Sequence, residues 1–197
     1  MPSALTKFEL IAFDLETTGF SAETCEIVEL GAVRFTADGR EIGRFQQLVN
    51  PQTPIPWEAT NVHGITDRMV SGQPVLGEVL PEFLAFLSGA PSLLMAHNAP
   101  FDLRFLAAGI QRTRVRKVPG HPVVDTLRLA RARLPHLRYH KLQDLCSHFD
   151  ITTPKAHRAL HDSLVVKDVF VQLTRCRPVV TSLEDVFELA KPKTLGR

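Results

Sequence analysis

The stretch Phe8-Glu9-Leu10-Ile11-Ala12-Phe13 is apolar at nearly every position and runs directly into Asp14-Leu15-Glu16. A short apolar run of this kind predicts a central β-strand that is covered on both faces. Asp14 and Glu16 lie two positions apart where this strand ends, so the pleat directs both carboxylates to the same side. The stretch therefore predicts a buried strand that delivers two acids to one end of a sheet.

The segments that follow predict a mixed α/β sheet with helices packed on it. Two strands, at residues 27–35 and 41–49, are separated by a turn that contains Asp38-Gly39, a strong hairpin signal. Further along the chain, short apolar runs alternate with helical periodicity. The remaining expected strands are 93–96 and 122–125, and the expected helices are a segment around 80–87, one starting at Pro100, and 126–134, 141–149 and 157–175.

Between the third and fourth expected strands, Pro51, Pro54 and Pro56 interrupt regular structure. The sequence therefore predicts an irregular loop that runs through Val62-His63-Gly64-Ile65-Thr66, with apolar periodicity returning near Leu76.

Length and composition indicate one domain. The 197 residues, of which 44% are hydrophobic, suffice for one core, and we expect it to span residues 1–177. Residues 178–197 are expected to form a short amphipathic tail and not a separate domain. The three cysteines show no C-x-x-C spacing, which argues against a disulfide framework and favours a reducing cytoplasm. No secretory leader and no apolar run of the ~20 residues that cross a bilayer are evident.

The formal net charge of +2 hides a local bias. Between Leu103 and Gln143, ten basic residues stand against the single acid Asp125. The ten are Arg104, Arg112, Arg114, Arg116, Lys117, Arg128, Arg131, Arg133, Arg138 and Lys141. Such a stretch could line a phosphate path, but taken alone it is better explained as a solvated basic face.

Two further aspartates lie on the apolar stripes of expected helices. Asp102 falls in the first turn of the helix that starts at Pro100, on one stripe with Phe105, Leu106 and Gly109. Asp162 heads the stripe of Val165, Val166, Val169, Phe170 and Leu173. Burying an unpaired carboxylate is costly, so a metal ion, strong hydrogen bonds or a raised pKa must compensate.

Together, Asp14, Glu16, Asp102 and Asp162 make a set of hard oxygen donors that suits Mg²⁺ or Mn²⁺. Two such ions about 3.5–4 Å apart can align the attacking water and the leaving oxygen of a phosphodiester. His157, placed in the loop or first turn before Asp162, is the expected general base because imidazole titrates near neutral pH.

Three motifs now occur in order, and together they resemble a known family. Asp14-Leu15-Glu16-Thr17-Thr18-Gly19, His97-Asn98-Ala99-Pro100-Phe101-Asp102 and His157-Arg158-Ala159-Leu160-His161-Asp162 are similar to the motifs of the DnaQ-like DEDD exonucleases. The closest likeness is to the histidine subtype (DEDDh), which includes the proofreading epsilon subunit of bacterial DNA polymerase III. The resemblance extends over about residues 8–175.

The resemblance implies a ribonuclease H-like fold with a mixed five-stranded sheet flanked by helices. It implies a 3′→5′ exonuclease that acts on single-stranded nucleic acid, DNA favoured, and releases nucleoside 5′-monophosphates with two divalent cations, Mg²⁺ or Mn²⁺. It assigns metal ligation to the four acids and the general base to His157. Thr17, Glu58 and His63 would contact the terminal nucleotide, and Phe20 or Val62 would pack on its base.

Several alternatives remain at this point. Ser163 stands where the family often has alanine, which concerns packing. A DNA polymerase subunit is a second expected partner, yet the tail is shorter than that of proofreading subunits, so a stand-alone enzyme fits equally. An exoribonuclease of the same family and a non-catalytic binding module are the competing functions. An HD-type phosphohydrolase is disfavoured because such proteins are helical.

Overall fold

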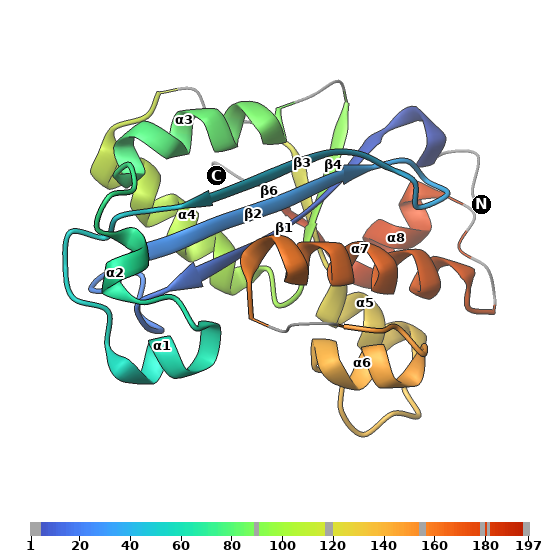
Figure 1. Ribbon diagram of the computed structural model, residues 1–197. Helices are drawn as coiled ribbons and strands as arrows, with labels where there is room; N and C mark the ends of the chain where they lie inside the picture. The colour runs from blue at the N-terminus through green and yellow to red at the C-terminus, as the bar shows by residue number, and fades with distance from the viewer. Residues whose placement is uncertain are drawn as a thin grey trace.

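A six-stranded mixed sheet in the order β3-β2-β1-β4-β5-β6 forms the centre of the protein in the computed structural model (Figure 1). The structure describes residues 5–88, 91–116, 120–153, 157–177, 180 and 182–194. The expected α/β architecture is therefore confirmed, and the apolar stretch that begins the sequence lies in the middle of the sheet.

The first three strands form an antiparallel meander, and the rest of the sheet is added on the other side of β1. β4 runs parallel to β1, β5 runs parallel to β4, and β6 runs antiparallel to β5. The bounds are β1 Glu9–Thr17, β2 Ile27–Phe35, β3 Glu41–Leu48, β4 Ser92–Ala96, β5 Pro122–Asp125 and β6 Lys193–Thr194. All five expected strands are present, and β6, with two residues, is too short to leave a periodic signal.

Helices cover both faces of the sheet, and most of them occupy the expected segments. A short 3-10 helix over Leu5–Lys7 precedes β1. The α-helices are α1 Trp57–His63, α2 Asp67–Val70, α3 Leu76–Leu87, α4 Pro100–Thr113, α5 Thr126–Arg133, α6 Leu142–His148, α7 Ala159–Arg175 and α8 Leu183–Ala190. The helix expected from His157 begins two residues later, at Ala159.

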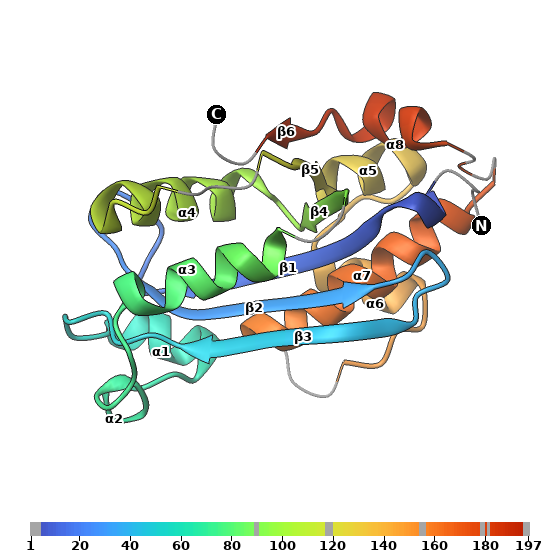
Figure 2. The same cartoon turned by 90° about the horizontal axis from the view of Figure 1, so that it is seen from above.

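The alternation along β1 separates two apolar layers. Ile11 and Phe13 pack with α3 and α4, whereas Leu10 and Ala12 pack with α7 and the helices beside it. Figure 2, which looks onto the meander, shows β3, β2 and β1 side by side with α7 on the face opposite α3. Asp14 and Glu16 share the parity of Leu10 and Ala12, so β1 directs both carboxylates to the side of α7.

The prediction of an irregular loop after β3 was wrong for part of that segment, because α1 and α2 lie within it. Pro56 immediately precedes the first turn of α1, a position where the missing amide costs nothing. Gly64 ends the helix at φ 70°, in the left-handed region that glycine enters readily. Proline thus marks the start of a helix here and does not exclude one.

The C-terminal segment is packed on the domain where the structure describes it. Val186 and Ala190 of α8 belong to the core on the α7 side, and α8 contacts α5 and β5. Within the described residues, no helix combines the length and the apolar character that a membrane span requires.

Candidate active site

Three carboxylates from two distant segments converge at the end of β1. Asp14 and Glu16 come from β1 and Asp162 from the first turn of α7, and one ligand oxygen of each lies within 4.8 Å of the others. Glu16 is buried, while Asp14 and Asp162 are partly buried. The predicted convergence of these acids is therefore present in the folded chain.

Asp102 lies beside this group but is not a member of it. Its side chain, in the first turn of α4, is 2% exposed. Its charge raises the pKa of both Asp14 and Glu16, which places it close to them. Asp102, the predicted fourth donor, therefore lies at the edge of the cluster of three acids and comes to it from α4.

Burial and mutual repulsion raise the pKa values of these acids. Burial, followed by the charge of Asp102, raises the pKa of Asp14 well above its usual range. Burial, followed by the charge of Asp162, raises the pKa of Glu16 to about 8. Burial also raises the pKa of Asp102 to about 8, against hydrogen bonds from the backbone of Asp102 and Leu15. The pKa of Asp162 is raised by burial, with His157 opposing.

This donor set fits a divalent cation. The oxygens are hard ligands, and a bound positive charge relieves the repulsion and desolvation that raise the carboxyl pKa values. The chemistry of the side chains thus favours the metal type that the sequence predicts, without fixing the ion or the number bound.

The raised pKa values make a testable prediction for stability and metal binding. The folded state holds these protons more tightly than the unfolded state does. The contribution of these carboxyl groups to the stability of the metal-free protein is therefore largest below pH about 4. That contribution is lost as the pH rises through about 8, the folded-state pKa of Glu16 and Asp102. Mn²⁺ or Mg²⁺, which requires the ionised form, should restore stability most strongly above that pH.

Thermal denaturation with EDTA or with Mn²⁺, at about pH 6 and about pH 8.5, measures this difference. We expect the Mn²⁺-induced rise in melting temperature to be larger at the higher pH. An equal rise at both values would show that the acids are already ionised at the lower one. Glu82→Gln, on the exposed face of α3, is the matched control and should leave the pH dependence unchanged.

His157 lies in the segment that enters α7, as expected. Its backbone amide donates to Oδ2 of Asp162 at 3.1 Å, and its φ of 64° is unusual for a residue with a side chain. The side chain is exposed. The backbone of His157 is therefore hydrogen-bonded to one of the clustered acids, while its imidazole is open to solvent.

The second motif is fixed by contacts with β5 and the segment after α5. The ring of His97 contacts Oγ1 of Thr126 at 3.1 Å through Nδ1 and the carbonyl oxygen of His140 at 3.0 Å through Nε2. Burial lowers the pKa of His97 to about 4, so the ring is neutral. The amide of Asn98 donates to Asp125 at 3.0 Å. These contacts hold the start of α4, and with it Asp102.

A cavity of about 490 Å³ adjoins Glu16. Its lining includes Thr17, Glu58 and His63, three residues that the resemblance assigns to the terminal nucleotide, together with Phe20 and Val62. Nδ1 of His63 accepts from the amide of Ile65 at 3.0 Å, so Nε2 carries the proton. Nε2 is buried and makes no hydrogen bond of normal geometry among the described residues. Burial lowers the pKa of His63, although the backbone of Thr17 lies close enough to oppose this shift.

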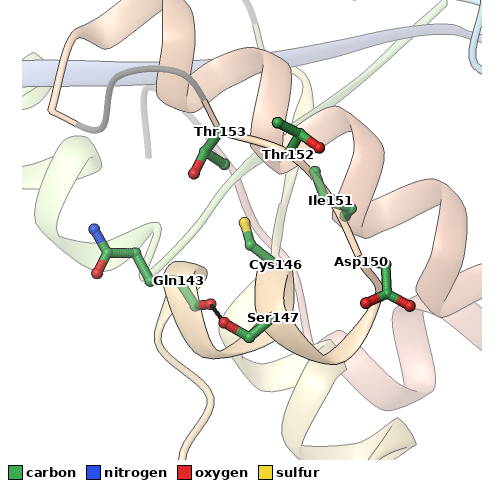
Figure 3. Close-up of a pocket in the computed structure, with 7 residues that line it drawn as sticks. All are labelled: Gln143, Cys146, Ser147, Asp150, Ile151, Thr152 and Thr153. Atoms are coloured by element: carbon green, nitrogen blue, oxygen red, sulfur yellow. Dashed lines mark hydrogen bonds between the residues drawn. The ribbon is translucent and has the colours of Figure 1, made fainter.

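Figure 3 shows a second cavity, of about 540 Å³, between α6 and the segment that follows it. It is lined by Gln143, Cys146, Ser147, Asp150, Ile151, Thr152 and Thr153. None of the four acids or His157 lines it. The cavity beside Glu16 is therefore the one that belongs to the predicted site.

Part of the basic stretch has a structural role. Arg112 donates to the carbonyl of Ala22 at 3.0 Å and pairs with Glu26 at 3.1 Å. Arg133 donates to the carbonyl oxygens of Leu173 and Cys176. Lys117 lies outside the described residues. A phosphate path thus remains a prediction for the other basic residues.

Sequence reasoning missed Glu29 and gave Arg158 no role. Glu29 is fully buried in β2, opposite Glu16 in the strand register, and forms a two-pronged ion pair with Arg158. The available signal was a single acid in the middle of a mostly apolar strand. Ser163 is also buried, with its hydroxyl 3.1 Å from the carbonyl oxygen of Gly31 and 2.6 Å from that of Ala159. Ser163 therefore packs in the interior, as expected, and its hydroxyl in addition donates a hydrogen bond to a backbone carbonyl.

A mixed sheet of this order, with carboxylates converging at the end of its central strand, defines the class as a nuclease with a ribonuclease H-like fold. Residues 11–170 match the model of the exonuclease family RNase_T, and the chain belongs to this family. The resemblance to DEDD exonucleases drawn from the three motifs is thereby confirmed.

Curated relatives include replication proteins. The DNA polymerase III subunit epsilon of Treponema pallidum is 39% identical over 164 residues, which cover 82% of this chain and 74% of that protein. The PolC-type DNA polymerase III of Halalkalibacterium halodurans is 43% identical over 155 residues, 79% of this chain. The chain spans only 10% of the length of that polymerase.

Among solved structures, exonuclease X in complex with 5′ overhanging duplex DNA is 26% identical, with a TM-score of 0.72. The match covers 92% of this chain and 99% of exonuclease X. Escherichia coli exonuclease I with a dT13 oligonucleotide has a TM-score of 0.77 at 16% identity, over 87% of this chain and 42% of that one, and supports the fold alone.

Proposed function

We propose that this chain is a 3′→5′ exonuclease that removes nucleoside 5′-monophosphates from the 3′ end of single-stranded nucleic acid, with DNA as the favoured substrate. The observation that carries the proposal is the convergence of Asp14, Glu16 and Asp162 within 4.8 Å beside a cavity of about 490 Å³. That volume falls in the range of about 300–1,000 Å³ that small-molecule sites occupy, so one terminal nucleotide fits. Relatives named as DNA polymerase III components favour DNA over RNA.

In this proposal, each residue has a defined task. Asp14, Glu16, Asp102 and Asp162 hold two divalent cations, which when bound acidify water and neutralise charge on the phosphate. His157 accepts the proton of the attacking water. The new bond joins the water oxygen to phosphorus, the bond from phosphorus to the 3′ oxygen breaks, and solvent protonates that oxygen.

The cavity residues would orient the terminal nucleotide. His63 lines the cavity and would contact a phosphate or sugar oxygen of this nucleotide. Thr17 and Glu58 supply polar contacts on the same wall, and Phe20 and Val62, which are 88% and 53% exposed, offer apolar surface for a base. Stacking on such surface tolerates every base, so we expect little sequence preference.

The test is digestion of matched end-labelled DNA and RNA oligonucleotides, with Mg²⁺ or Mn²⁺ and with one 3′ end blocked. We expect metal-dependent release of 5′-mononucleotides from free 3′ ends, faster from single-stranded DNA. Faster digestion of RNA would make the chain an exoribonuclease. Binding without digestion under all conditions would instead support a non-catalytic module, and digestion of the blocked strand would contradict the polarity.

A further inference from the structure

Glu29 is a charged residue in the interior with a full set of hydrogen-bond donors. Its carboxylate accepts from Nη2 of Arg158 at 2.7 Å, Nε of Arg158 at 3.0 Å, the amide of Ala159 at 2.9 Å and Nε2 of Gln46 at 2.9 Å. The side chain is completely buried. A buried ion pair contributes little net stability compared with apolar packing, so its presence calls for another explanation.

Two of the three residues that donate to Glu29, Arg158 and Ala159, belong to the segment that carries the proposed general base, whereas Gln46 lies in β3. Arg158 follows His157 directly, and Ala159 is the first residue of α7. The same turn contains the bond from the amide of His157 to Asp162. One buried carboxylate on β2 is thus attached to the backbone between His157 and Asp162.

The first turn of α7 also lies unusually close to β2. A Cβ atom at Gly31 would lie 2.1 Å from the amide nitrogen of Leu160, so only glycine permits this approach. Because Glu29 pairs with Glu16 in the register of β1 and β2, the attachment point lies on the strand pair that carries the clustered acids. Small movements of this turn would displace His157 relative to those acids.

We infer that Glu29 is a positioning residue: through Arg158 and the amide of Ala159 it holds the first turn of α7 against β2, so that His157 faces the acid cluster. This inference rests on the proposed function, because it assumes that His157 acts in the reaction. Glu29 itself does not line the cavity beside Glu16.

The variants Glu29→Gln and Arg158→Lys test the inference. The first removes the charge of the acceptor, and the second keeps the cation but loses the two-pronged contact. We expect kcat to fall about 10- to 100-fold in both, as for other residues that orient a catalytic group from outside, with KM little changed. Mn²⁺ affinity should be little changed in Arg158→Lys, which keeps the charge of Glu29 that acts on Asp14, Glu16 and Asp162. Hydrogen exchange at amides 157–162 should become faster, since the tether is weakened.

Glu9→Gln is the matched control. Glu9 and Arg34 form another ion pair on β1 and β2, at 3.3 Å, at the opposite end of β1 from the clustered acids. This variant loses a partly exposed ion pair between the same two strands, so we expect unchanged kcat and unchanged exchange at amides 157–162.

A double variant separates positioning from a general effect on folding. If Glu29 acts through His157, adding Glu29→Gln to His157→Ala should leave the residual rate of His157→Ala unchanged. An equal further decrease, or wild-type kcat and exchange in both Glu29→Gln and Arg158→Lys, would overturn the inference. Should Glu29→Gln fail to fold, Arg158→Lys carries the same comparison.

The outcome distinguishes this inference from the proposed function. An inactive wild-type protein on every substrate would refute the proposed function, while amide exchange would still show whether Glu29 holds the turn. An active wild type with an impaired His157→Ala variant and an unimpaired Glu29→Gln variant would refute the positioning role alone.

Discussion

Replacing Asp14 with alanine is expected to abolish metal-dependent release of mononucleotides while the fold stays intact. Asp14 contributes an oxygen to the cluster of three acids, and the charge of Asp102 acts on it as well. Its loss therefore removes the carboxylate that links Asp102 to the other two acids. Loss of an outer partner of a metal ligand already costs about 10- to 100-fold, and loss of a ligand should cost more, about a thousandfold. Single-turnover digestion of a labelled oligonucleotide measures the rate.

The control for Asp14→Ala is Glu82→Ala, which removes an exposed acid on α3. Circular dichroism should show the same strand and helix content for both variants and the wild type. Undiminished digestion by Asp14→Ala at saturating Mg²⁺ would remove the metal-site assignment.

Replacing His157 with alanine is expected to reduce the rate far more than it weakens metal binding. General acid–base catalysis contributes about 10²- to 10⁴-fold, and we expect the loss in kcat to fall within that range. The side chain is exposed, so its removal should leave little effect on packing. Calorimetric titration with Mn²⁺, beside steady-state digestion, separates the two quantities.

His121→Ala is the matched histidine control. His121 directly precedes β5, at the end of that strand opposite to Asp125, and should be silent in both measurements. Equal losses of rate and Mn²⁺ affinity in His157→Ala would identify His157 as a metal ligand instead of a base.

The sheet and the acids were predictable because their signals are local. Three signals carried the prediction: the apolar stretch before Asp14, the stripe headed by Asp162 and the proline at the start of α4. Each is a hydrophobic periodicity or a helix-start signal within one short segment. Periodicity alone placed Asp162 on the buried face of its helix. Motif order supplied the remaining link, since it grouped acids that lie far apart in the chain.

Other features depend on contacts that no local pattern carries. Glu29 and Arg158 are 129 positions apart, so the acid in β2 gives no indication of its partner. The proline-rich segment was assigned to a loop because proline disrupts helix interiors, whereas Pro56 stands just before a helix. Hydrogen bonds that fix His97 to Thr126 and His140 likewise arise only when the parallel strands align.

The repulsion among the buried acids also affects how this domain would respond to selection for heat resistance. Neutral substitutes at Asp14 or Glu16 remove a charge whose ionisation is disfavoured by burial and by its neighbours, and so should make the metal-free fold more robust. A library screened for survival of heating in chelator would then enrich inactive proteins. Screening with Mn²⁺ present would reverse that bias, because an ion that binds only the folded state stabilises the variants that keep the acids.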